Sequence, residues 1–169
     1  MGAAVLLIPP LCLLIAAVSD LLTMTIPNRI PLFLIASFAI IAPVSGLPWA
    51  EISMSLVAGA LVLTVCFGFF AAHLMGGGDV KLLAATAIWF GFSHSLAAFI
   101  VQTAFWGGCL TLVVMLLRKQ ADRYASIEAM VPTHILTTKK VPYGVAIGIA
   151  GMMTFWDSPI AVAALNLLK

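Results

Sequence analysis

Charged side chains are scarce in this sequence. Of its 169 residues only 8% are Asp, Glu, Lys or Arg, whereas 63% are hydrophobic, and the mean hydropathy is +1.19. Soluble domains carry roughly a quarter charged residues, so this chain lacks the polar surface that water requires. We therefore expect an all-α, polytopic membrane helix bundle, because helices satisfy their own backbone hydrogen bonds inside a lipid bilayer.

Cysteine and basic residues are also few, and their positions exclude several classes of protein. The three cysteines are scattered singly without a Cys-x-x-Cys pair, which argues against a disulfide framework or a zinc knuckle. The eight basic residues do not cluster with aromatics, so we expect no nucleic-acid partner. His73 and His94 have no companions that would complete a ligand set, and we read both as interfacial packing residues. No metal and no cofactor are predicted.

Six apolar segments follow one another along the chain. They run over residues 3–25, 31–42, 52–74, 80–92, 96–117 and 142–156, and a last apolar piece covers 160–168. Segments of 10–14 residues are ambiguous as membrane spans, but we count both short ones because the charge distribution requires it. The first segment lacks a basic flank and is read as a retained helix. We predict a single transmembrane domain over 1–169 with about six spans.

Basic residues lie almost entirely on one side of this map. Seven of the eight fall there, and only Lys169 falls on the other: the seven are Arg29, Lys81, Arg118, Lys119, Arg123, Lys139 and Lys140. The positive-inside rule makes their side cytoplasmic and places the N-terminus outside. Residues 118–140 form the one sizeable polar loop, which we predict to be cytoplasmic and solvated. Trp49, Trp89 and Trp156 fall near the predicted outer face, where an aromatic belt is expected.

Asp20 is an acidic residue inside the first apolar segment. Pro27 is the natural stop for that helix, which would place Asp20 about two turns inside it, roughly 10 Å from its end. A carboxylate there faces the negative end of the helix dipole. Because an acid within the membrane is a functional hypothesis by default, we favour a functional role. The alternative is a buried structural acid paired with Arg29 or Lys81.

Asp79 opens the fourth segment, directly after Gly76, Gly77 and Gly78. One interpretation is a helix N-cap, since Asp suits that position. A glycine run also lets an extended substrate approach closely, and Asp79 is predicted on the same side as Asp20. Two carboxylates about 3–5 Å apart share one proton. One can then activate water while the other protonates a peptide's leaving group, with no metal required.

Three motifs resemble those of one protease family. Gly76-Gly77-Gly78-Asp79-Val80-Lys81 is similar to the Gly-x-Gly-Asp-x-Lys motif of the type IV prepilin peptidases. Asp20 with the downstream Ile26-Pro27-Asn28 resembles that family's other aspartate, and Lys140-Val141-Pro142-Tyr143-Gly144 resembles the Pro-aromatic-Gly start of its last helix. The motifs occur in the family's order and cover essentially the whole bundle.

The resemblance implies a function and a set of site residues. Asp20 and Asp79 become the catalytic pair of a membrane aspartic endopeptidase that cuts a basic leader from prepilins or pseudopilins at the cytoplasmic (inner) membrane. The supporting or substrate-binding residues are Pro27, Asn28, Gly76, Gly77, Gly78, Lys81, Pro142, Tyr143 and Gly144. The chain lacks the paired Cys-x-x-Cys domain that accompanies N-methylation. It therefore resembles the short peptidases of tight-adherence (Flp-type) pilus systems or archaeal preflagellin peptidases.

The supporting residues each have a second interpretation. Lys81 either tunes the acidic pair or anchors its helix at the interface. Asn28 either hydrogen-bonds the active loop or caps the second segment. Gly144 and Gly148 are spaced for close helix packing, which we favour over substrate contact.

Two other functions compete with the peptidase. A small transporter or channel would use Asp20 and Asp79 as proton or cation sites, but it does not account for the Ile-Pro-Asn and Pro-Tyr-Gly motifs. A non-catalytic subunit of a secretion machine would account for the glycines, but not for the acid at position 20. The bilayer and a prepilin substrate are the partners that we expect.

Overall fold

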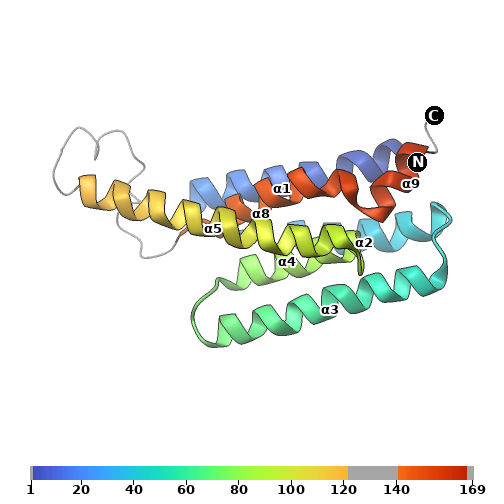
Figure 1. The fold of residues 1–169 in the computed structure, drawn as a ribbon, viewed down its shortest axis with the longest axis horizontal. Helices are drawn as coiled ribbons and strands as arrows, with labels where there is room; N and C mark the ends of the chain where they lie inside the picture. Colours follow the sequence, from blue (N-terminus) through green and yellow to red (C-terminus); the bar gives the residue numbers. More distant parts are fainter. Residues whose placement is uncertain (1, 122–140, 167–169) are drawn as a thin grey trace.

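The computed structural model describes residues 2–121 and 141–166, and all regular structure within them is helical. The elements are α1 (Gly2–Thr23), α2 (Arg29–Val44), α3 (Trp49–Ala71), α4 (Gly77–Phe90), α5 (His94–Ala121), α8 (Tyr143–Thr154), the 3-10 helix η1 (Phe155–Asp157) and α9 (Pro159–Asn166) (Figure 1). The predicted all-α fold is confirmed. The loop predicted over 118–140 lies outside the described residues from 122 onward, and its first four residues belong to the end of α5.

Several helices have the length and composition of membrane spans. Three helices qualify singly: Val5–Thr23, Trp49–Ala71 and His94–Ala121. A fourth span is possible if Tyr143–Asp157 and Pro159–Asn166, which are bent by 49° relative to each other, cross the membrane together. Large apolar side chains are exposed along them, Val101 to 67% for example, as lipid-facing helices require. A helical membrane bundle is therefore confirmed. The count of six spans stays a prediction, since α2 has 16 residues and α4 has 14.

Helix α4 lies at the centre of the bundle. It packs against α2, α3, α5, α8 and α9, and its residues from Val80 to Phe90 are buried except Lys81. Its 14 residues extend roughly 21 Å at 1.5 Å per residue, which is less than a bilayer's hydrocarbon core. Because protein rather than lipid surrounds α4, its ends can lie inside the bundle. This explains the short apolar segment predicted at 80–92.

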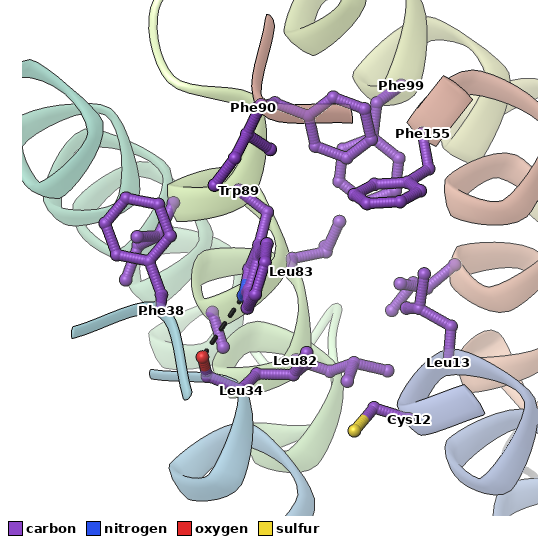
Figure 2. Packing of buried hydrophobic residues seen from close by; sticks show 14 of the residues in the cluster. Cys12, Leu13, Leu34, Phe38, Leu82, Leu83, Trp89, Phe90, Phe99 and Phe155 are labelled. Atoms are coloured by element: carbon purple, nitrogen blue, oxygen red, sulfur yellow. Dashed lines mark hydrogen bonds between the residues drawn. The ribbon is translucent and has the colours of Figure 1, made fainter. Parts of the chain in front are cut away.

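Aromatic side chains fill the core around the end of α4 (Figure 2). The rings of Phe90 and Phe99 stack with centroids 4.9 Å apart, and Phe38 meets Trp89 edge-on at 5.5 Å. The indole N–H of Trp89 donates to the carbonyl oxygen of Leu34 on α2 at 3.1 Å. Trp89 therefore joins two helices inside the protein.

One of the three tryptophans predicted to form an aromatic belt lies in the core instead. Trp49 and Trp156 are exposed to 76% and 47%, as a belt requires, whereas Trp89 is exposed to only 1%. The prediction for Trp89 was wrong because α4 is enclosed by other helices. Position along the chain predicts depth in the membrane, but it does not reveal which helix is enclosed.

Small residues let α8 approach α1 closely. A Cβ added at Gly148 would lie 2.9 Å from the Cβ of Ala17 and 3.1 Å from the carbonyl oxygen of Leu13. One turn earlier on α8, Gly144 faces Asp20 of α1. The close packing expected from the Gly144–Gly148 spacing is therefore present. It places the start of α8 beside the last turn of α1, towards the left in Figure 1.

Candidate active site

The end of α1 determines where Asp20 lies. The helix ends at Thr23, four residues before Pro27. Met24 adopts a left-handed conformation with φ of 52°, and its N–H donates to the carbonyl oxygen of Asp20 at 2.8 Å. The hydroxyl of Ser19 donates to the carbonyl oxygen of Thr25 at 3.0 Å, which draws the following chain back onto the helix. Asp20 is therefore in the last turn of α1, and the prediction of two turns from the end was wrong.

The carboxylate of Asp20 is buried against the beginning of α8. Its exposed fraction is 5%, and its Oδ2 accepts the backbone N–H of Gly144 at 2.7 Å. Gly144 is the second residue of α8, so its N–H is one of the first-turn donors that have no acceptor within the helix. The positive end of α8 thus offsets the unfavourable negative end of α1. Within residues 2–121 and 141–166, Asp20 pairs with neither Arg29 nor Lys81, the partners of the structural alternative.

Asp79 lies in the first turn of α4, where the helix dipole favours a carboxylate. The helix begins at Gly77 and its N-cap is Gly76, so the interpretation of Asp79 as the N-cap was wrong by three residues. Gly77 and Gly78 are the first two residues of the helix, where glycine costs less than it does in a helix interior. Asp79 is half-buried, and its carboxylate folds back over Gly76.

Each glycine before Asp79 accommodates a different neighbour. A Cβ added at Gly76 would lie 2.7 Å from Oδ2 of Asp79 itself. At Gly77 it would lie 3.3 Å from the ring of Phe70 on α3, and at Gly78 it would lie 3.2 Å from the Cβ of Ile26. The glycine run therefore brings the end of α3 and the α1–α2 connection against the start of α4.

Lys81 and Asn28 bind each other. The ammonium Nζ of Lys81 donates to Oδ1 of Asn28 at 2.9 Å, and both side chains are exposed. Asn28 is the N-cap residue of α2 by position, but its side chain makes no capping hydrogen bond. The capping interpretation of Asn28 is therefore not supported, and its side chain accepts a hydrogen bond from Lys81 of α4 instead. The pair links the α1–α2 connection, which follows Asp20, to α4, which carries Asp79.

One pocket of about 760 Å³ is lined by both Asp20 and Asp79. Its wall is formed by the ends of α1 and α3, the connections that follow them, Thr111 within α5, and the starts of α4 and α8. Of the predicted site residues, Asp20, Asn28, Gly76, Gly77, Gly78, Asp79 and Tyr143 line it. Pro27, Lys81, Pro142 and Gly144 do not line it, although Lys81 and Gly144 bond to residues that do.

Sequence reasoning missed part of the pocket wall. Phe70, His73 and Thr111 line the pocket, as does Met24. Among the described residues, Met24 and His73 are the non-glycine positions with positive φ, 52° and 59°. Such strained residues cluster at functional sites. No local sequence signal distinguishes them, because each adopts this conformation where its helix, α1 or α3, ends.

The site can perform acid–base chemistry. Two carboxylates that reach one cavity can divide the roles of proton acceptor and proton donor between them. Over the described ranges, no three His, Cys, Asp or Glu residues come together in a way that could hold a metal ion. The cavity also has an apolar wall, to which Phe70, Leu74 and Met75 contribute, so it suits a substrate with a hydrophobic part.

Gly76→Ala is expected to lower the activity of this site at little cost in stability. The new Cβ meets the end of a flexible side chain, so the fold adapts, but that side chain is Asp79 and its carboxylate must move. A displacement of about 1 Å can cost about 100-fold in rate. The measurement is the catalytic turnover of each purified variant, together with its thermal unfolding curve in detergent. Gly68→Ala is the matched control, since nothing lies within 4 Å of its Cβ position. Wild-type turnover in Gly76→Ala would contradict the expectation.

Comparison with known proteins identifies one family. The family model for the type IV leader peptidase family matches residues 7–116, a range that includes both Asp20 and Asp79. No curated protein and no solved structure matches the chain. The match ends within α5, so the Pro142-Tyr143-Gly144 segment lies beyond the matched range.

Proposed function

The chain belongs to the type IV leader peptidase family and is therefore a protease, and we propose that it is an aspartic endopeptidase with Asp20 and Asp79 as its catalytic pair. The observation that carries the proposal is that Asp20 and Asp79, which both lie in the matched region, line one pocket. They come from different helices, and packing rather than chain proximity brings them to the same cavity.

The proposed reaction is hydrolysis of a peptide bond. The ionised member of the pair takes a proton from a water molecule, which attacks the carbonyl carbon of the scissile bond. The protonated member donates its proton to the developing oxyanion, and the tetrahedral intermediate then collapses as a proton passes to the leaving nitrogen. The two carboxylates exchange roles in each turnover.

The proposed substrate is a prepilin or pseudopilin with a basic leader and a hydrophobic helix. A hydrogen-bonded helix hides its carbonyl groups, so the scissile segment must be extended when it reaches the pocket. The glycines at the start of α4 support this, because they line the pocket without side chains.

We place the reaction at the cytoplasmic face of the cytoplasmic membrane, in a short peptidase without N-methyltransferase activity, of the Flp-pilus type. The distribution of basic residues supports this side. The absence of any Cys-x-x-Cys pair from the sequence supports the short type. The end of the bundle where α1 and α3 end, and where α4 begins, is then the cytoplasmic end.

The test is co-expression with a type IV prepilin that carries an intact basic leader. We expect the prepilin to lose its leader, measured as a drop in intact mass and as a new N-terminus immediately before the hydrophobic helix. Prepilin expressed alone is the control. An unchanged prepilin mass across a panel of Flp-type prepilins, together with proton flux in liposomes that contain the purified chain, would favour the transporter instead.

A further inference from the structure

Gly144 is the residue of α8 that touches Asp20. Its N–H donates to Oδ2 of Asp20 at 2.7 Å, and the two residues are 124 positions apart in the chain. A Cβ added at Gly144 would lie 2.8 Å from the Cβ of Asp20, 2.9 Å from its Oδ2 and 2.9 Å from Cδ1 of Ile26. Any side chain at position 144 therefore displaces the carboxylate or pushes α8 away from it.

The beginning of α8 is itself held firmly. Pro142, its N-cap residue, is buried. The ring of Tyr143 lies directly on Gly107 of α5, where a Cβ would collide with it. One turn later Gly148 packs on Ala17 of α1. The N–H of Gly144 is consequently a donor on a rigid support, and a rigid donor fixes the direction of the carboxylate that accepts it.

We propose that Gly144 is a positioning residue for Asp20. Its N–H directs Oδ2 towards the start of α8, and its missing Cβ leaves the space that the carboxylate occupies. The inference rests on the proposed function, because it assigns Gly144 to the orientation of a catalytic group. It differs from the expectation of helix packing alone, which applies equally to Gly148.

Gly148 provides the matched control. Gly144→Ala and Gly148→Ala each add one methyl group to the same face of α8, and each methyl would lie within 3 Å of a side-chain atom of α1. At position 144 that atom belongs to Asp20, and at position 148 it belongs to Ala17. The two variants therefore share the packing penalty, and only one of them displaces the carboxylate.

The experiment measures kcat, KM and thermal unfolding in detergent, with a purified type IV prepilin that the wild-type chain cleaves. We expect Gly144→Ala to lower kcat by about 100-fold, the cost of misplacing a catalytic group by about 1 Å, with KM changed by less than about threefold. Gly148→Ala should lose a similar amount of thermal stability but keep kcat within about fivefold. Equal losses of kcat in the two variants, or wild-type kcat in Gly144→Ala, would overturn the inference.

Asp20→Asn and Asp79→Asn separate this inference from the proposed function. If both are inactive while Gly144→Ala is fully active, the catalytic pair stands and the positioning role fails. If either Asn variant is fully active, the proposed catalytic pair fails, whatever Gly144→Ala does.

A second measurement does not require Gly144→Ala to fold. Tyr143-Gly144 is the one Tyr-Gly pair in the sequence. Labelling with ¹³C-carbonyl tyrosine and ¹⁵N-glycine therefore selects the Gly144 amide as a single NMR signal. We expect Asp20→Ala to shift that amide proton upfield, because its acceptor is lost, and Asp79→Ala to leave it in place. A signal that Asp20→Ala does not move would overturn the inference.

Discussion

Asp20→Asn and Asp79→Asn are each expected to abolish leader cleavage, with kcat lowered by about 10⁴-fold, the upper range for loss of a general acid or base. Asn has nearly the shape of Asp, but it neither takes up nor releases a proton at neutral pH. Its amide oxygen can still accept the N–H of Gly144, the bond that Asp20 makes in the native chain. The fold should therefore survive, and only the chemistry should be lost.

The measurement is the fraction of co-expressed prepilin that keeps its leader, read by mass beside the amount of each variant in the membrane. Asp157→Asn is the control, because Asp157 is exposed in η1 and does not line the pocket. We expect it to process the substrate as the wild type does. Full processing by either Asp20→Asn or Asp79→Asn would refute the catalytic pair. If both variants cleave normally but block ion flux in liposomes, the transporter is the correct reading.

Trp89→Ala is expected to lower the free energy of unfolding by about 3–5 kcal/mol, the usual cost of truncating a large aromatic residue in a packed core. Trp89 is the largest of the fully buried side chains and is exposed to only 1%. Its ring meets Phe38 at 5.5 Å and Phe155 at 6.5 Å, so the substitution would leave a cavity between α2, α4 and η1 (Figure 2). Within a membrane, such packing contacts supply much of the stability.

The measurement is reversible unfolding in mixed micelles, compared between variants. Trp49→Ala is the control, since Trp49 is exposed to 76%, and a surface substitution typically changes stability by less than about 0.5 kcal/mol. Trp89→Phe keeps most of the packing but removes the N–H that donates to Leu34. Trp89→Phe should lower the free energy of unfolding by about 1 kcal/mol for the lost hydrogen bond. The smaller side-chain volume of Phe should lower it somewhat further. If Trp89→Ala were as stable as Trp49→Ala, the central position of α4 would be wrong.

The amino-acid sequence is sufficient to predict the class of fold and the two candidate acids. With 8% charged residues and 63% hydrophobic ones, only structures whose backbone groups bond to one another are possible in lipid, and the described residues are helical accordingly. Asp20 and Asp79 stood out because acids in apolar segments are unfavourable without a reason. The Gly-Gly-Gly-Asp-Val-Lys motif around Asp79 can be recognised in the sequence because its residues are adjacent in the chain.

Which of these residues meet depends on how the helices pack. The apolar pattern of residues 80–92 does not distinguish a helix enclosed by protein from one that faces lipid, and it therefore does not predict that Trp89 is buried in the core. His73 and Met24 line the pocket because the chain takes a left-handed turn at each of them, directly after a helix ends. Apolar periodicity does not predict such turns. Asp20 bonds to an N–H far along the chain, because close packing of α1 on α8 brings a helix C-terminus against a helix N-terminus. The local sequence pattern thus predicts that Asp20 and Asp79 are functional candidates, whereas helix packing places both in one pocket and brings Gly144 against Asp20.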